Sequence, residues 1–112
     1  MPNDESFFFD RSKESKKSED GSVRITMEGR VQKVGLRNWI KQRAVKMKVH
    51  GWVRNRTSGC VEAFFFGKDE DVREIVKLCH QGPSFAHIKK VKEFPESSTG
   101  NKPIEFTILP TV

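Results

Sequence analysis

The sequence predicts an α+β domain in which two helices cover one face of an antiparallel sheet. Two observations lead to this fold class. Short runs of alternating apolar residues indicate strands, and two longer runs with apolar residues at helical spacing indicate helices. Their order is strand, helix, strand, strand, helix, strand, which is typical of a two-layer βαββαβ sandwich. At 112 residues the chain is expected to form one such domain.

The first strand and the first helix are predicted over residues 23–28 and 37–47. The strand prediction rests on Val23, Ile25 and Met27, which alternate with polar residues. In the helix, apolar residues recur three or four positions apart, while lysines and arginines take much of the other side. The apolar positions are Leu36, Ile40, Ala44 and Met47.

Residues 49–56 and 60–66 are predicted to form a hairpin, because the turn residues Thr57, Ser58 and Gly59 separate them. A second helix is expected over residues 69–81. Its early aspartates suit the positive end of a helix, and its apolar stripe follows the helical period. The stripe consists of Val72, Ile75, Val76 and Cys79.

The fourth strand is predicted over residues 88–94 and a last short strand over residues 104–108. Ile88 and Val91 are out of phase with strict alternation, so we expect a bulge in the fourth strand. The complete order predicts a ferredoxin-like sandwich with an extra short C-terminal strand.

Residues 1–21 are expected to form a disordered tail, and residues 22–112 the folded domain. Residues 10–20 contain no apolar side chain and therefore cannot offset the entropy lost on ordering. The first 21 residues hold four basic and six acidic side chains and sum to −2, so the remainder carries +8 and the whole chain +6. Such a basic domain favours an anionic partner, which can be nucleic acid, a membrane surface or a phosphorylated small molecule.

Composition also predicts where the protein acts and what it does not bind. No run of 18 apolar residues is present, and the N-terminus lacks a secretory signal, so we expect a cytoplasmic protein with no membrane partner. Cys60 and Cys79 belong to no C-x-x-C motif, and the three histidines share no ligand spacing. We therefore expect no metal and no cofactor.

Residues 29–37 lie between the first strand and the first helix and contain two glycines and several cations. Glycine allows a positive φ that turns backbone N–H groups toward one point, and the first N–H groups of a helix have no partner within it. A phosphate fits such a site, and Arg37 could close on the same anion. The alternative interpretation is a simple turn with solvated charges.

Asn55 lies near the end of the second predicted strand, in phase with the apolar Val53. Its amide can donate and accept hydrogen bonds, and could orient a water molecule if it faced the phosphate site. The alternative is a turn asparagine preceding Thr57.

Four stretches occur in an order and spacing that resemble the acylphosphatases, and the resemblance covers residues 22 to about 109. They are Gly29-Arg30-Val31-Gln32-x-Val34-Gly35-x-Arg37, Gly51-Trp52-Val53-x-Asn55, Gly59-x-Val61-Glu62, and Gly82-Pro83 with Ala86 and Ile88.

The resemblance implies a metal-independent, cofactor-free hydrolase. Its substrate would be a small-molecule acyl phosphate, cleaved at the carboxyl–phosphate bond into a carboxylate and inorganic phosphate. Arg37 would bind the phosphate and Asn55 would position the attacking water. The cradle would be the backbone of Gln32, Lys33, Val34, Gly35 and Leu36. We expect a monomer.

Two residues depart from the family pattern, and other functions stay open. Lys33 replaces a usual glycine and would pay roughly 1–2 kcal/mol if its backbone requires positive φ; Leu36 replaces a usual phenylalanine. One alternative is a catalytically weak phosphate-binding regulator. Another is a basic module that binds RNA or an anionic partner. We expect no nucleic acid, because the run Phe64–Phe66 covers both faces of one strand.

Overall fold

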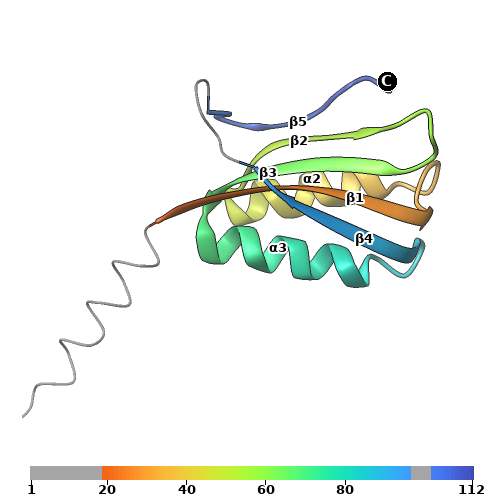
Figure 1. The fold of residues 1–112 in the computed structure, drawn as a ribbon, viewed down its shortest axis with the longest axis horizontal. Helices are drawn as coiled ribbons and strands as arrows, with labels where there is room; N and C mark the ends of the chain where they lie inside the picture. The colour runs from red at the N-terminus through yellow and green to blue at the C-terminus, as the bar shows by residue number, and fades with distance from the viewer. Residues whose placement is uncertain (1–18, 97–101) are drawn as a thin grey trace, which may run out of the picture.

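The computed structural model describes residues 19–96 and 102–112, and its elements follow the predicted order. The helices α2 and α3 lie against the same face of the sheet (Figure 1). This arrangement confirms the predicted ferredoxin-like α+β sandwich with an added C-terminal strand. The elements are β1 (Asp20–Arg30), α2 (Leu36–Met47), β2 (His50–Asn55), β3 (Val61–Lys68), α3 (Asp69–Gln81), β4 (His87–Pro95) and β5 (Phe106–Ile108).

The five strands of the sheet are arranged in the order β4-β1-β3-β2-β5. The pairs β4–β1, β1–β3 and β3–β2 are antiparallel, and β2–β3 is the predicted hairpin. β5 pairs parallel to β2, with Gly51 opposite Phe106. The sheet is therefore mixed rather than wholly antiparallel. The physical reason is that β5 runs opposite to β4 and so has the direction of β2.

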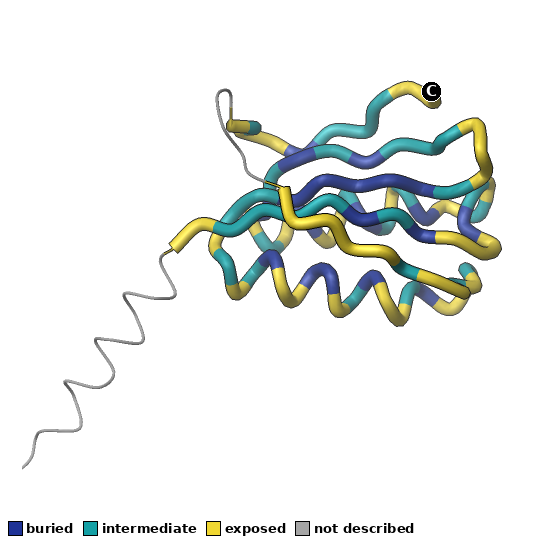
Figure 2. The backbone as a smooth tube through the Cα atoms, in the orientation of Figure 1, coloured by how far each residue is buried: buried dark blue, intermediate teal, exposed yellow. Residues whose placement is uncertain are grey.

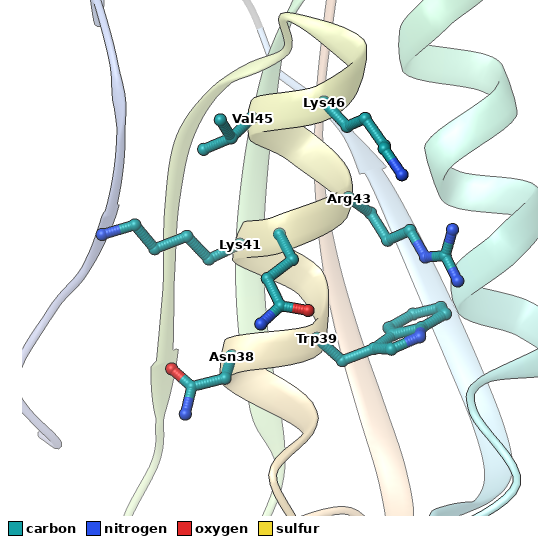
Figure 3. Close-up of a pocket in the computed structure, with 7 residues that line it drawn as sticks. Asn38, Trp39, Lys41, Arg43, Val45 and Lys46 are labelled. Atoms are coloured by element: carbon teal, nitrogen blue, oxygen red, sulfur yellow. The ribbon is translucent and has the colours of Figure 1, made fainter.

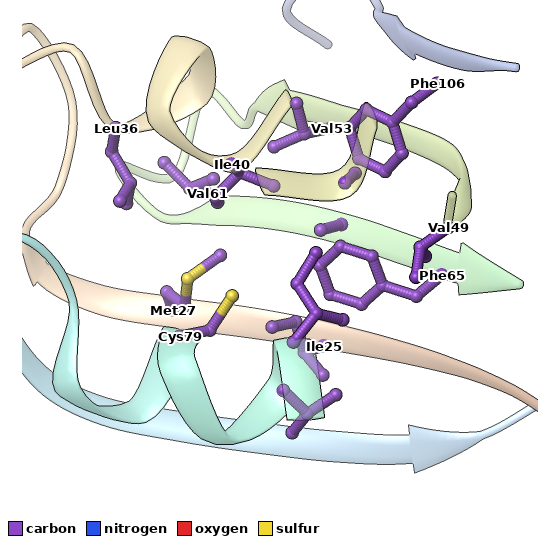
Figure 4. Close-up of a cluster of buried hydrophobic side chains, with 14 of the residues drawn as sticks. Ile25, Met27, Leu36, Ile40, Val49, Val53, Val61, Phe65, Cys79 and Phe106 are labelled. Carbon is purple, nitrogen blue, oxygen red and sulfur yellow. The ribbon is translucent and has the colours of Figure 1, made fainter. Parts of the chain in front are cut away.

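The core lies between the helices and one face of the sheet. Figure 4 shows the side chains of β1, β2 and β3 packing against those of α2 and α3. The rings of Phe65 and Phe106 stack with their centroids 5.8 Å apart, which attaches β5 to the core. The residues are most deeply buried along β3, and burial falls toward the outer strand β4 (Figure 2).

The predicted element boundaries need small corrections. β1 begins at Asp20, two residues before the expected start of the domain, while residues 1–18, and with them most of the predicted tail, lie outside the described residues. β5 begins at Phe106, since Ile104 is 85% exposed. The bulge is confirmed: the pairing of β1 with β4 shifts between Glu28 and Gly29. None of the described helices is long and apolar enough to cross a membrane.

Candidate active site

The loop between β1 and α2 ends in a left-handed turn at the start of the helix. Gly35 precedes α2 with φ 86°, a conformation that favours glycine. No side chain caps the first N–H groups of α2, and its first turn contains no acidic residue. An anion at this helix start would therefore meet partial positive charge without a competing carboxylate from the same turn.

Lys33 lies in the same loop, also in the left-handed region, with φ 63°. The condition for the predicted steric penalty is thus met. A non-glycine residue in this region costs roughly 1–2 kcal/mol, and such strain is often found at functional sites. The lysine is exposed and places a cation in this loop.

A hollow of about 140 Å³ lies at this loop. It brings together four of the predicted residues, because Lys33, Gly35, Leu36 and Arg37 all line it. Across residues 19–96 and 102–112, neither Lys33 nor Arg37 forms an ion pair. The positive charges of Lys33 and Arg37 are therefore available to an anion. The lining residues that the sequence did not indicate are Val31, Asn38 and Ile108.

Gln32 and Val34 do not line the hollow, and their side chains have structural contacts instead. The amide nitrogen Nε2 of Gln32 donates to the carbonyl oxygen of Arg56 at 2.8 Å and to that of Cys60 at 2.9 Å. Val34 packs against the core. Gln32 thereby ties the loop to the connection between β2 and β3, which begins directly after Asn55.

Asn55 ends β2, opposite Val61 on β3. Its side-chain oxygen Oδ1 is buried and has no hydrogen-bond partner among the described residues. A buried acceptor without a partner is costly, so it requires an explanation such as a bound water or ligand. Of the predicted residues, Asn55 is the one with a buried side-chain acceptor that has no partner among the described residues.

A family model described as Acylphosphatase matches residues 19–108. The chain belongs to the acylphosphatase family. The acylphosphatase of Rhodopseudomonas palustris (strain BisB18) is 45% identical over 92 residues, which cover 79% of this chain and 93% of that protein. The acylphosphatase of Nitrobacter winogradskyi is 41% identical over 92 residues, with the same coverage. The crystal structure of acylphosphatase from Bacillus subtilis superimposes with a TM-score of 0.73 at 31% identity, covering 79% of this chain and 97% of that one.

A larger hollow of about 760 Å³ follows the outward side of α2 in this acylphosphatase-family chain (Figure 3). Trp39, Lys41, Arg43 and Lys46 are among its lining residues, and it shares only Asn38 with the hollow at the loop. It includes neither the glycine turn nor Arg37. We therefore place the candidate active site of this acylphosphatase fold at the loop and not on α2.

Metal ligands are not grouped in the described part of this acylphosphatase-family chain. Over residues 19–96 and 102–112, no three His, Cys, Asp or Glu side chains come together in a way that could hold a metal ion. That the reaction is independent of metal stays a prediction.

Proposed function

We propose that the protein hydrolyses the carboxyl–phosphate bond of acyl phosphates, releasing a carboxylate and inorganic phosphate. The observation that carries this proposal is the hollow in which Arg37 and Lys33 meet the uncapped start of α2. Membership of the acylphosphatase family supports it over a binding module without activity.

The loop and Arg37 are proposed to bind the phosphoryl group. Backbone N–H groups of residues 32–36 would donate to its oxygens, as helix starts and glycine turns do for anions. The guanidinium of Arg37 would add charge-assisted hydrogen bonds and hold the group in one orientation. Lys33, exposed at the edge of the hollow, would add a second positive charge near the substrate.

Asn55 is proposed to orient the attacking water. The unpartnered, buried Oδ1 supports this role, because it could accept a hydrogen bond from a water proton. The water oxygen would attack phosphorus while the bond to the carboxylate oxygen breaks, and the carboxylate would leave with the bonding electrons. A phosphoryl oxygen would take the water proton, so no side chain needs to act as the base.

This mechanism requires little beyond position and charge. The departing carboxylate is a good leaving group, so a strong general acid is not needed. Rate enhancement would come from alignment of water and phosphorus and from donors that already surround the phosphoryl oxygens. The chemistry described requires neither a metal nor a cofactor, and neither a nucleic acid nor a membrane partner. We further propose that the protein acts as a monomer, since one chain supplies every residue that the mechanism uses. We also propose that it acts in the cytoplasm.

Hydrolysis of benzoyl phosphate by the wild-type protein after dialysis against EDTA tests the proposal. We expect turnover unchanged by EDTA, with no hydrolysis of p-nitrophenyl phosphate, whose leaving group is poorer. Loss of activity in EDTA would contradict metal independence. Binding of inorganic phosphate without turnover would identify a phosphate-binding regulator instead.

The variant Asn55→Ala tests the role of the water. We expect kcat to fall about a hundredfold, because the attacking water loses its alignment, while KM changes little. Normal kcat in a variant with a normal thermal unfolding curve would show that Asn55 does not position the water.

A further inference from the structure

We propose that the open face of the sheet, opposite α2 and α3, binds single-stranded nucleic acid. Figure 1 shows both helices on the other face. The proposal concerns a second ligand on a surface separate from the loop and does not depend on the proposed hydrolysis.

One row of side chains crosses four strands of this face at the same level. Arg24 on β1 lies opposite both Phe94 on β4 and Phe64 on β3, and Phe64 lies opposite Trp52 on β2. Arg24, Phe64 and Trp52 each precede a fully buried core residue on their strands, so they point away from the helices. The pairing thus builds a lateral row of three rings and a guanidinium.

The two outer rings of this row, Phe94 and Trp52, are accessible, and each lies against an arginine. Phe94 is 36% exposed and Trp52 is half-buried, whereas Phe64 is 7% exposed and stacks on Trp52 with centroids 6.2 Å apart. The guanidinium carbon of Arg24 lies 4.4 Å from the centroid of Phe94, and that of Arg54 lies 4.7 Å from the centroid of Trp52. Aromatic rings and positive charge therefore lie side by side on this surface.

Next to this row, the surface around Glu62 carries an excess of positive charge. Glu62, 5% exposed, forms ion pairs with Arg24 at 3.1 Å, Arg54 at 2.9 Å and Arg56 at 2.9 Å. Burial alone would raise the pKa of the Glu62 carboxyl, but hydrogen bonds from Arg56 and Arg54 outweigh it and hold that pKa below its ordinary value. One ionised carboxylate thus faces three guanidinium groups.

The three guanidinium groups keep donors free for a further anion. Each carries five N–H donors, and Glu62 takes one from each of them. Arg24 gives another to Glu96 at 2.9 Å. The remaining donors and the surplus charge suit phosphate groups that pass over the sheet.

This combination fits single strands better than other anions. Unstacked bases stack on exposed aromatic rings, while phosphates contact nearby arginines and lysines. Bases paired within a duplex cannot reach a row of rings, and a purely acidic peptide would use the cations without the rings. The sequence predicted no nucleic acid because the phenylalanine run covers both faces of β3. That argument did not include the rings that β2 and β4 contribute at the level of Phe64.

Binding of a fluorescein-labelled oligouridylate of about 12 nucleotides, followed by anisotropy, tests the proposal on the full chain. We compare Trp52→Leu with Trp39→Leu. The two tryptophans form a matched pair, since both are half-buried and Arg43 lies 5.4 Å from the ring of Trp39 as Arg54 lies near that of Trp52. Trp39 is on α2 and faces away from the row.

We expect wild type to bind, with affinity that falls steeply between about 50 and 200 mM salt. Trp52→Leu should weaken binding at least about fivefold, the effect of one lost base stack, and Trp39→Leu should leave it unchanged. Lack of binding at low salt, equal losses in both variants, or equally tight binding of a duplex would overturn the proposal. If circular dichroism shows that Trp52→Leu does not fold, Phe94→Leu on the outer strand takes its place with the same expectations.

Discussion

The side chain of Gln32 is predicted to hold the loop of the candidate active site against the β2–β3 connection, and an isosteric substitution can test this. Both of its hydrogen bonds are donations from Nε2, at 2.8 Å to Arg56 and 2.9 Å to Cys60. Gln32→Glu keeps the size and shape of the side chain but replaces the donor by a carboxylate oxygen. Two carbonyl oxygens would then face a negative charge.

The expected loss of stability follows from these two bonds. Each neutral hydrogen bond contributes about 1 kcal/mol, so Gln32→Ala should lower the free energy of unfolding by about 2 kcal/mol. Gln32→Glu should cost more, about 3 kcal/mol, because the carbonyls lose their donor and meet an anion. For a domain of this size 1 kcal/mol lowers Tm by about 4–8 °C, so the alanine variant should unfold about 10 °C early and the glutamate variant earlier still.

Thermal unfolding at neutral pH, followed by circular dichroism, measures these differences. The matched control is Gln42→Glu, the same substitution at an exposed position on the outward side of α2. It should shift Tm little. We also expect kcat on benzoyl phosphate to fall in Gln32→Glu and not in Gln42→Glu. The reason is that Gln32 donates to the carbonyl oxygen of Arg56, which directly follows Asn55.

A Tm for Gln32→Glu equal to that of the Gln42→Glu control would refute the reasoning, since the two donations could not then contribute as described. Equal destabilisation by alanine and glutamate would refute the assignment of Nε2 as the atom that faces both carbonyls.

Three further predictions concern single side chains. Glu62→Gln should lower the free energy of unfolding at pH 7 by about 2 kcal/mol, because three arginines lose their shared anion. Since the folded-state pKa of Glu62 is lowered from 4.5, its contribution is present above that pH and is lost as the pH falls further, so urea titrations of the two proteins should converge in acid. Lys33→Gly should raise KM for benzoyl phosphate about threefold, as expected for one exposed charge, and should change Tm little because relief of strain offsets the entropy of glycine. Burial raises the pKa of the Cys79 thiol to about 12, so a disulfide reagent at pH 8 should modify Cys60 in the folded protein and Cys79 only after unfolding.

Each of these predictions has an outcome that contradicts it. A constant difference between wild type and Glu62→Gln from pH 7 to acid would show that the carboxylate is not stabilised by its arginines. An unchanged KM in Lys33→Gly would remove the lysine from the substrate site, and rapid modification of Cys79 in the folded state would contradict its burial.

The elements of the fold could be predicted because their apolar periodicity is local. The stripes of α2 and α3 and the alternation of Val23, Ile25 and Met27 depend on neighbouring residues alone. The start of β1 at Asp20 could not be predicted in this way. Asp20 and Gly21 have no apolar pattern, and they extend the strand because Lys68 and Gly67 on β3 pair with them.

In the candidate site, too, local features could be predicted and features that depend on distant segments could not. The glycine turn could be anticipated from residue types within one loop. The positive φ at Lys33 could be anticipated only through the family resemblance, which has glycine at that position. Ile108 could not, because it reaches the hollow only through the parallel pairing of β5 with β2. The hydrogen bonds from Gln32 to Arg56 and Cys60 also join segments that are distant in the chain, and backbone carbonyl acceptors carry no local sequence signal.

The row on the open face is the clearest case of information that only the register supplies. Phe94 and Trp52 are far apart in the chain, and both are aligned with Phe64 through strand pairing. A shift of one residue in either pair would turn these side chains to the opposite face.

Hydrolysis of benzoyl phosphate by Arg37→Ala, compared with Arg43→Ala, tests the central claim most directly. Both arginines belong to α2, but Arg37 lines the hollow at the loop and Arg43 lies on the outward side of the helix. We expect kcat/KM to fall at least about a hundredfold in Arg37→Ala, because charge-assisted hydrogen bonds to the phosphoryl group are lost. Arg43→Ala should retain wild-type kcat/KM. Equal activity of the two folded variants would contradict the placement of the active site at this loop.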